Sequence, residues 1–156
     1  MTLDEVIARE GIRQTITNYT IAADKRDAAL FNALWTEDAI FEFAGFPPVG
    51  GFKCEGLDAI RNWTAAWGKL RNVDDPTLRS ASFARHNLTT CHIELTGTGV
   101  ATARTFFIVV TDIGPDHAGT YSDILVRQSE RWLFSHRRIA LDWRSPDSIY
   151  PAVKRQ

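Results

Sequence analysis

Residues 82–111 read SFARHNLTTCHIELTGTGVATARTFFIVVT, and they carry the strongest strand pattern of the chain. Its apolar and β-branched side chains predict two long strands, Ser82–Leu95 and Val100–Thr111. The connection between them, Gly97-Thr98-Gly99, is short and rich in glycine, which favours a tight hairpin turn. The stretch therefore predicts the first half of an antiparallel sheet.

The second half of the sheet is expected downstream of residue 112. Strand-like segments at Thr120–Glu130 and Trp132–Trp143 form another pair, joined tightly around Glu130–Arg131 and preceded by a loop at Asp112–Gly119. Four long strands in succession predict a meander, which twists strongly and can curl around the elements that cover it.

The pattern before residue 70 is mostly helical. Apolar residues at helical spacing predict helices at Leu3–Ala23, from Asp27 through Trp35, and at Gly56–Leu70, with short strands at Ala39–Phe43 and Val49–Cys54. Helices followed by a meander indicate an α+β fold in which the helices cover one face of the sheet. A cone with an interior pocket is one economical result.

The composition is that of one globular domain. The chain has 156 residues, 44% hydrophobic and 24% charged, which excludes a disordered chain. A net charge of −1 gives no electrostatic footprint for nucleic acid or an anionic membrane. The longest apolar run, Phe106–Val110, is far too short to span a membrane. We expect a single domain over residues 1–145 and a surface tail over 146–156.

Two features indicate a cytoplasmic protein. Cys54 and Cys91 stand alone, which is too few cysteines for a disulfide framework. The N-terminus lacks the basic region and apolar stretch of a signal peptide.

Several short motifs, in this order and spacing, resemble the SnoaL-like branch of the NTF2-like superfamily. They are Tyr19-(x4)-Asp24-Lys-Arg-Asp27, Leu34-Trp-Thr-Glu-Asp-Ala39, Arg85-His-Asn87, Gly119-(x)-Tyr121-(x)-Asp123 and the ending Trp132–Trp143. The resemblance covers roughly residues 5 to 145 and implies a cone-shaped fold, with a curved antiparallel sheet, three N-terminal helices and one deep apolar pocket. Members of this branch include dehydratases, a dehydrochlorinase, polyketide cyclases and an isomerase, whereas others are non-catalytic, so the fold does not settle the function.

The lyases of this group use a histidine base steadied by an aspartate, and the motif match places these roles on His86 and Asp24. Imidazole titrates near neutral pH, so it can take a proton from carbon and return one to a leaving hydroxyl. A carboxylate on one ring nitrogen fixes the tautomer and stabilises the imidazolium. The same resemblance makes Tyr19 a donor to the substrate oxygen, although Tyr19 could equally complete the apolar face of its helix.

Further residues are candidates for binding a flat or polycyclic substrate. Aromatic side chains in the predicted core, which could instead be plain packing, are Phe41, Trp63, Trp67 and Phe107. Tyr121 shares a strand face with Asp123, and cross-strand ion pairs commonly explain such sets. Arg104 could hold an anionic substrate group, pair with Asp123, or lie on the outer face.

We expect neither a metal nor a cofactor. His92, His117 and His136 show no HxH or HxxxH spacing, and no P-loop or dinucleotide-binding fingerprint occurs. The expected partners are an apolar or aromatic small molecule and, by the resemblance, further copies of the chain in a homodimer or homotrimer.

Three functions are compatible with these residues. A cofactor-independent lyase of the dehydratase type leads. An isomerase or cyclase acting on a polyketide-like or steroid-like substrate would use the same base without losing water. A non-catalytic binding or assembly module would have a pocket filled by its own side chains.

Overall fold

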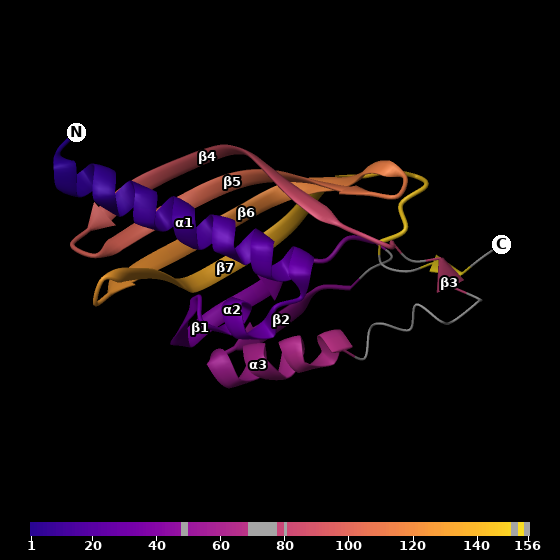
Figure 1. Ribbon diagram of the computed structural model, residues 1–156, viewed down its shortest axis with the longest axis horizontal. Helices are drawn as coiled ribbons and strands as arrows, with labels where there is room; N and C mark the ends of the chain where they lie inside the picture. The colour runs from indigo at the N-terminus through magenta and orange to yellow at the C-terminus, as the bar shows by residue number, and fades with distance from the viewer. Residues whose placement is uncertain (48–49, 69–77, 80, 151–152, 155–156) are drawn as a thin grey trace.

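The fold is known from a computed structural model that describes residues 1–47, 50–68, 78, 79, 81–150, 153 and 154. The first helix, α1, spans Leu3–Lys25 (Figure 1), so the predicted helix is confirmed and runs two residues further. A capping box between Thr2 and Glu5 starts it. Arg26, in the left-handed conformation with φ 55°, ends it, and this sharp stop fixes the position of the last helical turn.

The second helix is shorter than predicted. The Asp27 side chain caps α2, Ala28–Asn32, by accepting a hydrogen bond from the backbone N–H of Leu30. The expectation that this helix runs through Trp35 is wrong, because strand β1 (Trp35–Phe43) begins there. The carbonyl oxygen of Leu34 accepts a hydrogen bond from the backbone N–H of Phe134. Pairing with the strand that contains Phe134 therefore outweighs the helical spacing of the apolar residues.

The next elements form one edge of the sheet. Strand β2 spans Phe52–Glu55, helix α3 spans Leu57–Ala65, and the 3₁₀ turn η1 covers Ala66–Gly68. The predicted end of the third helix at Leu70 and the predicted start of the return strand at Val49 lie outside the described residues.

The predicted four-strand meander is present. Its strands are β4 (Arg85–Gly97), β5 (Val100–Thr111), β6 (Gly114–Gln128) and β7 (Arg131–Arg144). The six-stranded sheet has the order β2-β1-β7-β6-β5-β4, and all its neighbours are antiparallel except β1 and β7. A separate small ribbon pairs β3 (Leu78–Arg79) with β8 (Val153–Lys154).

Two predicted connections differ from the structure. Residues Gly114–Gly119 were expected in a loop, but they belong to β6 because they pair with β5 as far as Thr111. The turn between β6 and β7 lies one residue earlier than expected, at Ser129–Glu130, where Ser129 takes a positive φ of 55°.

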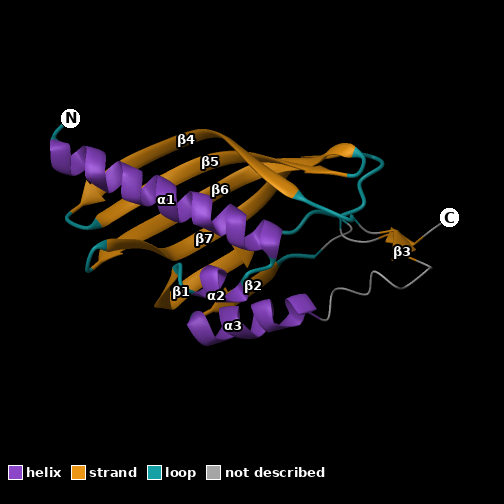
Figure 2. Ribbon diagram, viewed as in Figure 1, coloured by secondary structure: helices purple, strands orange, loops and turns teal. Residues whose placement is uncertain are grey.

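The helices cover one face of the curved sheet (Figure 2). Helix α1 crosses that face and contacts β4 and β7, while α3 packs on β1 and β2. The core lies between these layers. Among the described residues, no helix is both long and apolar enough to cross a membrane.

Candidate active site

A histidine and an aspartate 62 residues apart meet where the end of α1 passes the start of β4. The Nδ1 atom of His86 lies 2.6 Å from Oδ1 of Asp24. The backbone N–H of His86 also donates to both carboxylate oxygens, at 3.3 and 3.2 Å. Because the carboxylate accepts at Nδ1, that nitrogen carries the proton, and in the neutral ring the lone pair is on Nε2.

This dyad is partly open. The exposed fractions of the two side chains are 21% for His86 and 12% for Asp24. The Phe107 ring lies 6.2 Å from the imidazole, on the side of the core. Such an imidazole can receive a proton from a bound molecule at Nε2, while Asp24 stabilises the resulting positive charge.

An aromatic path leads from the dyad into the core. Phe107 stacks on Tyr121, with ring centroids 4.3 Å apart and planes tilted by 17°. Tyr121 in turn meets Tyr19 at 5.6 Å. Burial raises the pKa of both phenols above the ordinary value, so both stay protonated at neutral pH and can serve as hydrogen-bond donors.

A fully buried arginine lies at the inner end of this path. Arg137 donates two hydrogen bonds of 2.7 Å to Asp123, from Nε and Nη2. Its guanidinium carbon also lies 4.0–4.3 Å from the ring centroids of Tyr19, Tyr121 and Phe134. The remaining nitrogen, Nη1, is buried and has no partner among the described residues. The predicted cross-strand pairing of Asp123 is confirmed, and its partner is Arg137 rather than Arg104.

The other aromatic candidates lie on the far side of Tyr19 from the dyad. Phe41 contacts Tyr19, with ring centroids 6.3 Å apart, and Trp63 at 5.1 Å. Trp63 of α3 and Trp67 of η1 pack edge to face, with their ring centroids 5.3 Å apart. These rings fill the space between helices and sheet, so the interior is packed by aromatic side chains at the place where the sequence predicts a pocket.

Arg104 does not join this site. It lies on the outer face of the sheet, with its guanidinium 5.7 Å from the Phe106 ring centroid, because the strand alternation that buries Phe107 turns Arg104 outward. It borders an open hollow of about 440 Å³, whose charged and titratable lining side chains include His92, Glu94, Arg104, His136 and Arg138. The hollow lies on the face of the sheet opposite the dyad.

Residues 4–138 match the family model described as the SnoaL-like domain. This chain belongs to the SnoaL-like domain family. The resemblance inferred from the short motifs is therefore confirmed.

Solved structures with the same fold agree with the SnoaL-like assignment. A Mycobacterium tuberculosis protein of unknown function is 26% identical, with a TM-score of 0.69, covering 89% of this chain and 74% of its own. A candidate scytalone dehydratase from Novosphingobium aromaticivorans is 20% identical (TM-score 0.70, coverage 93% and 91%). A hexachlorocyclohexane dehydrochlorinase is 17% identical (TM-score 0.66, coverage 99% and 93%). No curated protein matches the chain.

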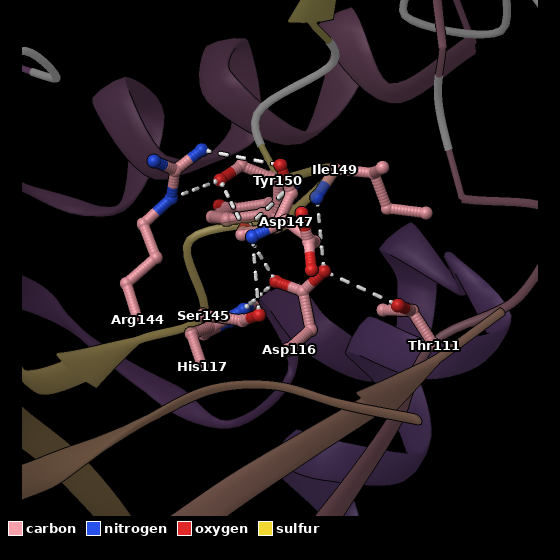
Figure 3. A network of polar contacts seen from close by, with 9 residues as sticks. Thr111, Asp116, His117, Arg144, Ser145, Asp147, Ile149 and Tyr150 are labelled. Atoms are coloured by element: carbon pink, nitrogen blue, oxygen red, sulfur yellow. Dashed lines mark hydrogen bonds and ion pairs between the residues drawn. The ribbon is translucent and has the colours of Figure 1, made fainter. Parts of the chain in front are cut away.

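Sequence reasoning missed a second Asp–His pair in this SnoaL-like domain. Nδ1 of His117 lies 2.7 Å from Oδ1 of Asp116, and both side chains are buried. Figure 3 shows Asp116 at the centre of a network. Its carboxylate accepts from the hydroxyls of Thr111 and Ser148 and from the backbone N–H of Ile149.

The same network corrects the predicted surface tail. Ser148 and Ile149 are only 4% and 3% exposed, because their hydrogen bonds to Asp116 hold the segment against the sheet. Tyr150 stacks on His117, with ring centroids 4.7 Å apart. Within the described part of the chain, no three His, Cys, Asp or Glu side chains cluster as a metal site would require.

Proposed function

We propose that this SnoaL-like protein is a cofactor-independent lyase of the dehydratase type, with His86 as its base. The observation that carries the proposal is the 2.6 Å contact between Nδ1 of His86 and Asp24, beside a partly exposed imidazole. Among the described residues no hydrogen bond reaches Nε2 of His86, so this atom is available to a bound molecule.

The reaction follows from this geometry. Nε2 of His86 takes a proton from a carbon next to a carbonyl, and the C–H electron pair forms an enolate. The enolate collapses to a carbon–carbon double bond as the β carbon–oxygen bond breaks. The leaving oxygen takes the proton from His86 and departs as water, which restores the neutral imidazole. Asp24 stabilises the transient imidazolium throughout.

Tyr19 is proposed as the donor to the carbonyl oxygen. Burial raises the pKa of Tyr19, so the phenol keeps its proton and can stabilise the developing oxyanion by hydrogen bonding. Arg137, 4.0 Å from the Tyr19 ring centroid, adds a positive charge behind that phenol. Tyr19 is 4% exposed, so the substrate reaches it only when the surrounding rings rearrange.

An apolar ring compound is the proposed substrate class. The side chains between the imidazole and the core are apolar rings, since Phe107 stacks on Tyr121 beside His86 and Phe41, Trp63 and Trp67 pack further inside. Two structures with the same fold are named as a candidate dehydratase and a dehydrochlorinase. Both names describe elimination reactions, which supports the proposed lyase activity.

The test uses cyclic β-hydroxy ketones of one to three fused rings. We expect the wild-type protein to release water from at least one of them, measured by product mass. The His86→Ala variant should keep its circular dichroism spectrum and lose turnover. His92→Ala is the matched control, because His92 lies on the same strand but is exposed on the other face. Equal turnover in wild type and His86→Ala would overturn the mechanism.

The packed aromatic interior favours one other candidate, a non-catalytic binding or assembly module. That candidate predicts that wild type binds ring compounds, or further copies of itself, and converts none of the panel. An isomerase or cyclase would use the same dyad, and it is distinguished by a product of unchanged mass.

A further inference from the structure

A short segment that is neither helix nor strand, residues 145–150, leaves the sheet at the row that carries the proposed base. In this row Val109 is the cross-strand partner of both His86 and His117. His117 is in turn the partner of Arg144, the last residue of β7. The segment, named the strap, therefore starts at the same end of the sheet as the dyad.

One buried carboxylate holds the strap, as Figure 3 shows. Asp116 accepts hydrogen bonds from the Ser148 hydroxyl at 2.7 Å and from the backbone N–H of Ile149 at 3.1 Å. Its backbone oxygen accepts another from the N–H of Ser145, at 2.8 Å. Burial alone would raise the pKa of the Asp116 carboxyl, but hydrogen bonds from His117, Ser148 and Ile149 lower it, so this latch is ionised at neutral pH.

Tyr150 is the part of the strap that covers the site. Its ring stacks on the His117 ring, with centroids 4.7 Å apart and planes tilted by 23°. Arg144 pins the end of the strap by donating from Nε to the Tyr150 carbonyl oxygen at 2.9 Å. Under the stack, the Phe107 ring lies 6.4 Å from His117 and 6.2 Å from His86. The strap thus closes the inner face of the sheet beside the dyad.

The closed form is held weakly enough to open. The covering side chain, Tyr150, is 53% exposed, so little of its surface leaves the interior when the strap moves. The strands and helices are held by continuous backbone hydrogen bonds, whereas residues 145–150 depend on side-chain contacts, which are typical of segments that open locally. The buried Ile149 keeps the closed form dominant.

We propose that residues 145–150 are an autoinhibitory strap, latched by Asp116, whose opening uncovers His117 and the ring of Phe107 beside the base His86. Phe107 is 4% exposed in the closed form, so a molecule held at His86 requires this uncovering. The inference rests on the proposed function of the same site, since it assigns the strap to access of the substrate. Asp116 is then a positioning residue that acts through the strap.

Ser148→Ala tests the latch, because it removes one hydrogen bond to Asp116 and leaves the dyad untouched. The open form should become about threefold to tenfold more populated. NMR measures this as faster hydrogen exchange of the Ile149 amide. The amide of Val109, which lies inside the sheet, reports global unfolding and should keep its exchange rate.

Modification by diethyl pyrocarbonate, followed by peptide mass spectrometry, measures access to each imidazole. In Ser148→Ala, His117 should react about threefold to tenfold faster, since the reagent meets that buried ring only in the open form. His86 is partly exposed already and should react at least about twofold faster. His92, on the outer face, should react at the wild-type rate.

A pair of variants at the covering residue separates the ring from the rest of the strap. Tyr150→Ala removes the stack on His117 and should accelerate the modification of His117 and His86. Tyr150→Phe is the matched control, because it keeps the stacked ring and should react like wild type.

The outcomes distinguish the strap from the lyase, because chemical modification needs no substrate. Faster amide exchange in Ser148→Ala with unchanged modification of His86 would show that the strap only packs, and would overturn the inference. Unchanged modification in Tyr150→Ala would overturn it as well. If His86 responds in both variants but wild type converts none of the cyclic β-hydroxy ketones, the strap is supported and the lyase is overturned.

Discussion

Replacing Asp123 by Asn should destabilise the protein strongly. The change removes the negative charge that faces Arg137, a side chain with no exposed surface, and leaves the guanidinium beside a neutral amide. Burial alone lowers the pKa of Arg137, and in wild type the Asp123 carboxylate outweighs burial and raises it. The guanidinium is so basic that it keeps its proton at neutral pH even when that carboxylate is removed. An uncompensated buried charge then remains in the core.

The size of the effect follows from the contacts. Removing one partner of a buried ion pair costs about 3–5 kcal/mol. The three aromatic rings around Arg137 still attract the cation, so we expect the lower end, about 3 kcal/mol. For a domain of this size each kcal/mol lowers Tm by about 2–4 °C, which predicts a decrease of about 6–12 °C.

Urea unfolding followed by tryptophan fluorescence, together with a thermal melt, measures this change. The control is the double variant Asp123→Leu with Arg137→Met, which replaces both charges by apolar groups and should lie within about 2 kcal/mol of wild type. A loss below about 1 kcal/mol in Asp123→Asn, or equal losses in the single and double variants, would show that no uncompensated buried charge causes the destabilisation.

Three further predictions concern the site. Asp24→Asn should keep the fold and lower turnover of any accepted β-hydroxy ketone by about 10²-fold or more, since it removes the charge that stabilises the imidazolium; undiminished turnover would contradict this. Gly119→Ala should destabilise the protein by about 2 kcal/mol or more in urea unfolding, because the added Cβ would collide with the Ala140 carbonyl oxygen and lie 2.8 Å from the Phe107 ring; a neutral effect would contradict the packing. The pKa of His117 is lowered in the folded protein, so below about pH 6.5 the unfolded chain binds a proton more readily and Tm should fall. His117→Phe should reduce this fall in thermal melts from pH 7 to 5, and an identical dependence of Tm on pH in wild type and variant would contradict the role of His117.

The dyad could be predicted from the sequence because it belongs to a family pattern. No local rule joins Asp24 to His86, and a separation of 62 residues gives no geometric information by itself. The motif order supplied the pairing, and the contact of 2.6 Å agrees with it. The long strands were predictable for a different reason, since Val100–Thr111 has both its ends marked by turn residues and its bounds are confirmed without change.

The Arg137–Asp123 pair could not be assigned because of a β-bulge. A strict period of two puts Phe134 and Arg137 on opposite faces of the strand. The register between β6 and β7 shifts between Ile124 and Leu125, and this irregularity turns both Phe134 and Arg137 inward. Nothing in the local sequence marks the extra residue.

The Asp116 network was missed because its residues lie in segments whose sequence is typical of loops. Pro115 and two nearby glycines favour a loop, and Ser148 lies in a polar segment near the C-terminus. Their structure comes from a tertiary contact, in which one carboxylate serves four donors. Propensity gives little information about a segment whose order depends on a single distant side chain.

The two Asp–His pairs are not equivalent, and the difference assigns their roles. Protonating one imidazole makes protonation of the other harder, because two like charges would face one another across Val109. The His117 side chain is 6% exposed and that of His86 is 21% exposed, so burial penalises the charged form more strongly at His117. Burial therefore lowers the pKa of His117 and favours its neutral form. Of the two imidazoles, that of His86 is the more exposed and is the one that a bound molecule reaches more easily.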